Sequence, residues 1–229
     1  MDKYQILLTN DDGIQSPGLW AAAEALSALG YVTVAAPREQ SSGMGRSLPG
    51  TSDGIIKPET LVVHGQPWTV YAVGGSPAQA VLHGILEIMP QKPDLVVSGI
   101  NYGENVGTGV TISGTVGAAL EASAFGLPAL AISLETDIGH HLSLSPEVDF
   151  AAAGYFTRYF GRLLLGRQLP PDVSVLKVDV PIELSVLSMK LGRSIKFDPA
   201  TEKIVGDEEA DKLAIPEYRA PWKFPTEYL

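Results

Sequence analysis

Hydrophobic and polar positions alternate along this chain in blocks that are typical, in turn, of strands and helices. Short apolar, β-branched runs that predict strands lie at 4–9, 31–36, 94–98, 129–133 and 173–180. Amphipathic patterns that predict helices lie between them, at 17–29, 77–89, 115–125 and 146–165. This alternation predicts an α/β fold with a Rossmann-like, mostly parallel sheet and helices on both faces.

Two further segments depart from the alternation. The β-like runs 60–64 and 69–73 are separated by a short Gly-Gln-Pro segment and predict a hairpin. Beyond about residue 184 the pattern becomes irregular: 184–197 could form a second hairpin, and a proline-rich arm carries Tyr218, Trp222, Phe224 and Tyr228. We therefore expect one domain over 1–229, with a core of about 1–184 and a C-terminal oligomerisation extension of about 185–229. Aromatic side chains are costly to leave in water, so the arm should dock on its own domain or on a neighbouring subunit.

The first strand ends in two adjacent carboxylates, Asp11 and Asp12, followed by Gly13. A hairpin turn would need a second strand, but Pro17 opens a helical pattern instead. Two interpretations remain open from these residues alone. The acids could cap the chain turn, which is the commoner use of such residues, or they could bind a cation that relieves their mutual repulsion.

Other strand ends carry polar residues suited to the same place. Ser41 and Ser42 follow the second strand, Asn101 follows the strand at 94–98, and the next helix begins with Ser113, Gly114 and Thr115. The carboxyl ends of parallel strands share one edge of a sheet, where ligands bind near the point at which strand order reverses. Oxygen ligands from Asp, Asn and Ser suit a hard ion such as Mg²⁺ or Mn²⁺, and zinc is disfavoured because the chain has four histidines and no cysteine.

The glycine-rich loop 99–113 leads into a helix start, where free N–H groups and the helix dipole can hold phosphate. The loop is neither a Walker P-loop nor a dinucleotide fingerprint, because neither GxxxxGK[ST] nor GxGxxG after the first strand occurs. Ser113 and Thr115 should cap the helix in any case, and phosphate binding would be an added role.

The amino-acid composition excludes some classes of binding partner. The net charge of −10, from 26 acidic and 16 basic residues, argues against binding nucleic acid duplexes or anionic membranes. A phosphate group would therefore need a metal ion or backbone N–H groups. No signal-peptide or membrane-spanning pattern is evident, and the lack of cysteine fits a cytoplasmic protein.

Several stretches together resemble one known family. LLTNDDGIQSPG, AAPREQSSGMGRS, GGSPAQAV, PDLVVSGINYGENVG and ISGTVGAALEA, in this order over about residues 4–133, closely resemble the survival protein E (SurE) nucleotidase family. The resemblance favours metal binding over capping for the acidic pair. The chain departs from the usual family pattern at Gln79 and Ala80, at Thr108 and Gly109, and over most of the region after Val180.

The resemblance also implies roles for individual residues. It implies Asp11, Asp12, Ser42 and Asn101 as ligands of one Mg²⁺ or Mn²⁺ ion, and Asn105, Ser113, Gly114 and Thr115 as phosphate-binding residues. Members of the family are metal-dependent phosphatases of nucleoside 5′- and 3′-monophosphates that assemble as homodimers or homotetramers through exchanged C-terminal segments.

We therefore expect a 5′-nucleotidase in which Asp11 and Asp12 are catalytic. Asp11 would act chiefly as a ligand and Asp12 as a ligand that could also orient or deprotonate the attacking water. An aspartyl-phosphate mechanism is a weaker rival, because the Asp-x-Asp pattern of such phosphatases is absent at the first strand end. The alternative from another class is a noncatalytic nucleotide- or metal-binding regulatory protein.

Overall fold

The computed structural model describes residues 3–63, 65–141, 145, 147–166, 170, 173–180, 191–193, 195–198, 201 and 203–213. The chain divides into two compact units, 1–180 and 181–229, and each is described by itself. Most of the hairpin expected over 184–197 and the aromatic arm with Trp222 lie outside the described residues. The expectation of one domain over 1–229 stays a prediction.

The first unit is built on a seven-stranded sheet with the order β3-β4-β2-β1-β5-β6-β7. Its neighbouring strands are parallel except for the antiparallel β3–β4 hairpin at one edge. The strands are β1 Tyr4–Thr9, β2 Gly30–Pro37, β3 Ile56–Val63, β4 Gln66–Val73, β5 Leu95–Tyr102, β6 Ala129–Leu134 and β7 Leu176–Val180. The predicted mostly parallel α/β sheet is confirmed.

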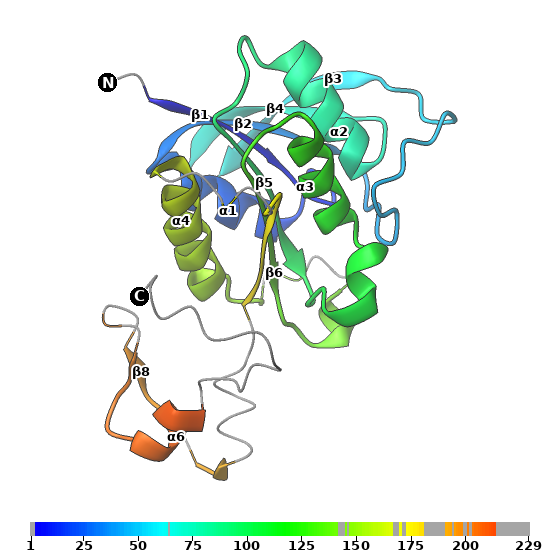
Figure 1. The fold of residues 1–229 in the computed structure, drawn as a ribbon. Helices are drawn as coiled ribbons and strands as arrows, with labels where there is room; N and C mark the ends of the chain where they lie inside the picture. The colour runs from blue at the N-terminus through cyan, green and yellow to red at the C-terminus, as the bar shows by residue number, and fades with distance from the viewer. Residues whose placement is uncertain are drawn as a thin grey trace. The chain divides into compact units, whose positions relative to one another are not determined.

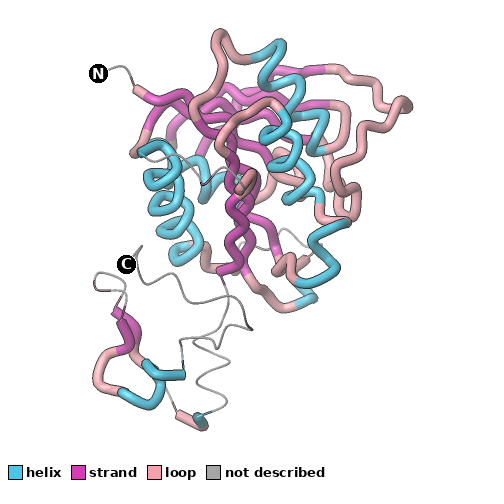
Figure 2. The backbone as a smooth tube through the Cα atoms, in the orientation of Figure 1, coloured by secondary structure: helices cyan, strands magenta, loops and turns pink. Residues whose placement is uncertain are grey.

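Helices cover both faces of this sheet, as Figures 1 and 2 show. One face packs against α1 (Pro17–Ser27) and α4 (Ala151–Gly166), and the other against α2 (Pro77–His83) and α3 (Gly114–Ala124). Alternation along β1 supplies both cores, because Ile6 and Leu8 join the α1–α4 side and Leu7 joins the α2–α3 side. Strands buried on both faces explain the continuous apolar runs of the sequence.

Several element boundaries differ from those predicted. β5 continues through Asn101 to Tyr102, because a register shift after Ser98 restores its pairing with β6. The α2 helix ends at His83 and passes into a π-helical turn, η1 (Gly84–Ile88). Helix α4 begins at Ala151, whose N–H donates to Asp149 Oδ1 (2.8 Å). Two short 3₁₀ helices, η2 (Gly107–Thr111) and η3 (Ile138–His140), complete the first unit's described elements.

The second unit is described only in part. It contains an antiparallel pair of two-residue strands, β8 (Phe197–Asp198) and β9 (Lys203–Ile204), and the helix α6 (Glu208–Leu213). Arg193 forms ion pairs with Asp207 and Glu209. In the part of the chain that the structure describes, no helix has both the length and the apolar character needed to cross a membrane.

Strand order reverses between β1 and β5. The chain moves from β1 outward to β2, and later returns to the other side of β1 with β5. In open α/β sheets this reversal leaves a crevice at the carboxyl ends of the two strands. Asp11 and Asp12 follow β1 and Asn101 lies near the end of β5, so three of the predicted site residues are placed at this strand-order reversal.

Candidate functional site

The two acidic residues are held in a tight, buried turn after β1. Asp11 is 4% exposed and Asp12 is 3% exposed, so neither carboxylate is solvated in the usual way. Gly13 adopts φ +92°, a left-handed conformation that favours glycine, and its carbonyl accepts from Asn10 Nδ2 (3.0 Å). The loop after β2 closes the turn, because Ser41 N–H donates to the Asp11 carbonyl (2.7 Å).

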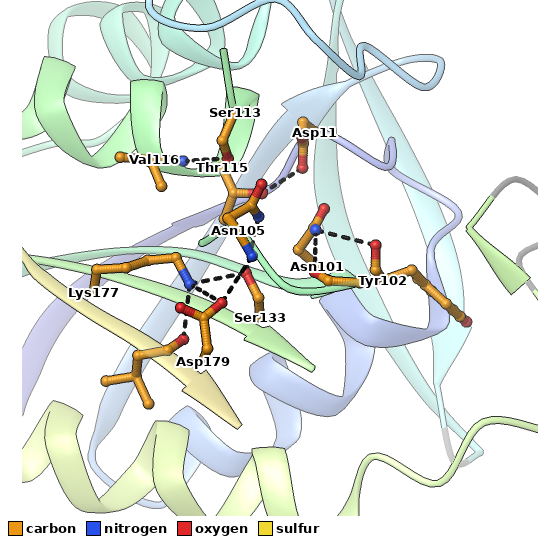
Figure 3. A network of polar contacts seen from close by, with 12 residues as sticks. Asp11, Asn101, Tyr102, Asn105, Ser113, Thr115, Val116, Ser133, Lys177 and Asp179 are labelled. Carbon is orange, nitrogen blue, oxygen red and sulfur yellow. Dashed lines mark hydrogen bonds and ion pairs between the residues drawn. The ribbon is translucent and has the colours of Figure 1, made fainter. Parts of the chain in front are cut away.

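Asp11 contacts the start of helix α3. Thr115 Oγ1 donates to Asp11 Oδ1 (2.6 Å), as Figure 3 shows. Burial raises the pKa of Asp11, while the Thr115 hydroxyl and the backbone N–H groups of Thr115 and Gly114 oppose that rise. A Cβ at Gly114 would lie 2.7 Å from Asp11 Cβ, so only glycine allows this close approach. The helix start thus already faces a negative charge.

Asp12 faces the end of β5 and the loop after β2. Tyr102 N–H donates to Asp12 Oδ2 (3.1 Å), and Gln40 Nε2 lies 3.4 Å from Oδ1. Burial and, to a smaller extent, the neighbouring charge of Asp11 raise the pKa of Asp12 to about 7. The two hydrogen bonds oppose this shift without cancelling it.

The donor set around the acidic pair fits a hard divalent cation. Among the described residues, no Lys, Arg or His side chain forms an ion pair with Asp11 or Asp12, although both are buried. The neighbouring Asn10 Oδ1 is also buried and has no hydrogen-bond partner within the described structure. Adjacent buried carboxylates without a compensating charge are costly, and a Mg²⁺ or Mn²⁺ ion would supply that charge.

Asn101 is oriented by its own strand end. Its Nδ2 donates to the carbonyls of Tyr102 (3.1 Å) and Gly103 (2.7 Å), which directs its oxygen away from them. In Figure 3 this oxygen points toward the side on which Asp11 lies. Asn101 is 8% exposed, so its carbonyl oxygen is well placed as a neutral ligand.

Ser42 differs from the other predicted ligands because it is exposed. No hydrogen bond between Ser42 and the acidic pair is present in the described structure, although the adjacent Ser41 contacts the Asp11 backbone. The loop that follows is attached to α3 by an ion pair between Arg46 and the buried Glu121 (2.6 Å). Ser42 therefore lies beside the site on a loop whose far end is anchored.

The predicted phosphate-binding residues fall into two groups. Ser113 caps α3, since its Oγ accepts from Val116 N–H (3.1 Å), and Gly114 and Thr115 contact Asp11. Asn105 belongs to a second polar group, in which its Nδ2 donates to Ser133 Oγ (3.0 Å) and its backbone N–H to Asp179 Oδ1 (2.8 Å). The capping prediction is confirmed for Ser113 and is wrong for Thr115, whose hydroxyl donates to Asp11 instead. Phosphate binding stays a prediction.

Sequence analysis missed the partners of these residues. Gln40, Ser133, Lys177 and Asp179 all contact a predicted site residue or its immediate partner. A signal existed for two of them, because Lys177 and Asp179 place charges at alternate positions of an otherwise apolar strand, LKVDV. Ser133 and Gln40 carried no comparable signal.

Tyr102, which follows Asn101, is buried and offers no surface for stacking a nucleotide base. The residue is 4% exposed, and its ring packs edge-to-face against Phe150, with ring centroids 5.0 Å apart. The loop after β6 also contacts Gln40, because the backbone carbonyl of His141 accepts a hydrogen bond from Gln40 Nε2 (3.0 Å).

Comparisons with known proteins identify the family. The family model described as Survival protein SurE matches residues 6–200. A relative from Archaeoglobus fulgidus named 5′-nucleotidase SurE is 46% identical over 178 residues, which are 77% of this chain and 67% of the relative. Another of that name from Methanopyrus kandleri is 55% identical over 131 residues, 57% of this chain and 49% of the relative.

Comparison with a solved structure points to the same family as the sequence comparisons. The crystal structure of the SurE protein from Aquifex aeolicus superimposes with a TM-score of 0.62 at 35% identity, covering 77% of this chain and 66% of that chain. The matched regions thus span about half to two thirds of these relatives' lengths. The family model covers most of the sequence, and the solved structure shares the fold of the region it covers. The chain therefore belongs to the SurE family.

Proposed function

We propose that this protein is a divalent-metal-dependent phosphomonoesterase, a 5′-nucleotidase that hydrolyses nucleoside 5′-monophosphates, and also 3′-monophosphates, to nucleoside and phosphate. The observation that carries the proposal is the buried pair Asp11 and Asp12 at the strand-order reversal, with no cationic side chain paired to either among the described residues. The name 5′-nucleotidase carried by the curated relatives supports the same reaction.

Asp11, Asp12 and Asn101 would hold one Mg²⁺ or Mn²⁺ ion, with Ser42 joining from the adjacent loop. When bound, the ion supplies positive charge that draws electron density from the phosphoryl group. Thr115 and the start of α3 would orient Asp11 as a ligand, because its carboxylate accepts their hydrogen bonds. Asp12 would also orient the attacking water and accept its proton.

The phosphate would lie between the start of α3 and the loop that carries Asn105. Ser113, Gly114 and Thr115 place backbone N–H groups at a helix start, where anions are stabilised. Asn105 would donate its remaining amide hydrogen to a phosphoryl oxygen, since Ser133 uses only one of the two on Nδ2. These preorganised donors would stabilise charge as it develops in the transition state.

The test is phosphate release from a panel of nucleoside 5′- and 3′-monophosphates with Mg²⁺, Mn²⁺ or EDTA. We expect release with either metal and loss of release on chelation. Asp11→Ala and Asp12→Ala should abolish turnover and keep the fold, whereas Glu104→Ala, an exposed acid in a neighbouring loop, should keep activity. Full activity in both aspartate variants would refute the assignment.

The same panel separates the second candidate, a noncatalytic regulatory protein that binds nucleotide or metal. Nucleotide binding without release of phosphate under every metal condition would favour that regulator.

We further propose that the protein is a cytoplasmic homodimer or homotetramer. The cysteine-free composition supports this compartment, and symmetric self-association is the common form of soluble oligomers.

A further inference from the structure

One lysine lies at the centre of the polar group that holds Asn105. Lys177 Nζ donates to Ser133 Oγ (3.1 Å) and to Asp179 Oδ1 (2.6 Å). These two oxygens are the acceptors for the side chain and the backbone N–H of Asn105. Figure 3 shows the amine between Ser133 and Asp179, with Asn105 bonded to both.

Strand register explains why these groups meet. Asp179 of β7 lies opposite Ser133 of β6, and Lys177 lies two residues earlier on the same strand. Leu176 and Val178 pack against the α1–α4 core, so alternation places Lys177 and Asp179 on the opposite face. That face carries α3 and the loop of Asn105, and the group thus links β6 and β7 to the segment after β5.

Lys177 and Asp179 are half-buried, so water screens their charges only in part. The side chains of Lys177 and Asp179 are 18% and 21% exposed. Burial lowers the pKa of Lys177, and the adjacent Asp179 carboxylate opposes that shift. Without Lys177, Asp179 would keep a poorly solvated negative charge one hydrogen bond away from Asn105, where a phosphate dianion is expected.

We propose that Lys177 is a positioning residue of the phosphate site: it fixes Ser133 and Asp179 as the two anchors of Asn105, and it neutralises the Asp179 carboxylate that would otherwise repel phosphate. This inference rests on the proposed function, which places phosphate at Asn105. It concerns affinity for the phosphate group itself, so it applies equally to substrate and to product.

The experiment titrates inorganic phosphate, in the presence of Mg²⁺, into the full-length wild type and into Lys177→Met, Asp179→Asn and the double variant. Lys177→Met should weaken phosphate binding about tenfold and raise KM for a nucleoside monophosphate similarly, with a smaller change in kcat. Asp179→Asn should change affinity less than about threefold, because the amide oxygen still accepts from Asn105 N–H. Lys57→Met, which removes an exposed lysine from β3, is the matched charge control and should bind as wild type.

The double variant is the decisive arm. It removes the unneutralised carboxylate, so it should bind phosphate more tightly than Lys177→Met alone, a recovery that loss of packing would not produce. Unchanged affinity in Lys177→Met, or a double variant as weak as Lys177→Met, would overturn the inference. Circular dichroism checks folding, and if Lys177→Met does not fold, Lys177→Gln removes the same charge while keeping a donor for Ser133, with the same expected weakening.

The titration also separates this inference from the proposed function, because phosphate binding does not need turnover. If wild type binds phosphate and Lys177→Met weakens it, the inference stands even when no nucleotide is hydrolysed. If wild type hydrolyses nucleotides and Lys177→Met binds phosphate normally, the proposed function stands and the inference fails.

Discussion

At the scale of single residues, the site is organised around two carboxylates that the fold withdraws from water. Hydrogen bonds from the protein take the place of some of the lost hydration. The chief ones are from the Thr115 hydroxyl to Asp11 and from the Tyr102 N–H to Asp12. These contacts satisfy oxygen atoms but leave the pair's negative charge in place. A buried charge that side chains do not neutralise is a common mark of a functional site, and here it supports the proposed cation site.

Substitution of Gly114 tests how closely helix α3 must approach Asp11. Gly114→Ala should cost about 1–3 kcal/mol of stability and strongly reduce turnover, because the new methyl group would lie 2.7 Å from Asp11 Cβ. Gly109→Ala is the matched control, since a Cβ there meets nothing within 4 Å. Chemical denaturation and phosphate release measure both effects. Equal behaviour of the two variants would contradict the close-contact argument.

The raised pKa of Asp12 predicts how the metal-free protein responds to pH. The unfolded carboxyl ionises near 3.8 and the folded one only near 7, so the folded state binds the extra proton between these values. Stability should therefore fall as pH rises from about 4 to about 7 and level off above, by at most about 4 kcal/mol. Urea unfolding in EDTA should show this fall in wild type relative to Asp12→Asn. Parallel pH profiles for the two proteins would rule it out.

At the scale of elements, α3 connects the acidic pair to the loop after β2. Its start contacts Asp11, its middle packs on the backbone of Gly45, and Glu121 pairs with Arg46. One helix thus supports both the predicted carboxylate ligand and the loop that carries Ser42. We expect a change in its middle to reach the metal site.

Gly117→Ala tests this connection. A Cβ at Gly117 would lie 2.1 Å from the Gly45 carbonyl oxygen, so the loop must move although alanine favours the helix itself. Metal affinity, measured by titration calorimetry with Mn²⁺, should fall several-fold. Gly154→Ala in α4 is the control, because its nearest neighbours would be 3.9 Å away, and it should be neutral or slightly stabilising. Unchanged Mn²⁺ affinity in Gly117→Ala would show that the loop position is irrelevant.

At the scale of the whole molecule, an acidic chain must bind an anionic substrate. The net charge is −10, so the protein's overall field repels phosphate and local charges must overcome it. The proposed site would offset this repulsion with the cation that the acidic pair would hold, with the N–H groups at the start of α3, and with Lys177, which neutralises Asp179. High salt should therefore impair substrate capture little.

The last prediction concerns the oligomeric state of the protein. We expect light scattering of the full-length protein to report two or four times the chain mass of 24.3 kDa. The resemblance of the sequence to a family of dimers and tetramers motivates this expectation. A single-chain mass over a wide concentration range would contradict it.

The sequence by itself determined the order of strands and helices, the α/β class and the position of Asp11, Asp12 and Asn101 at one sheet edge. Local hydrophobic periodicity and the geometry of parallel strands are sufficient for that. Only the tertiary structure decided which groups surround the acids: Gln40 is 28 residues from Asp12, and Thr115 is 104 residues from Asp11. It also decided that β5 continues past Ser98 and that Asn105 is anchored by β6 and β7. Such contacts depend on strand order and register, which no local pattern of residues encodes.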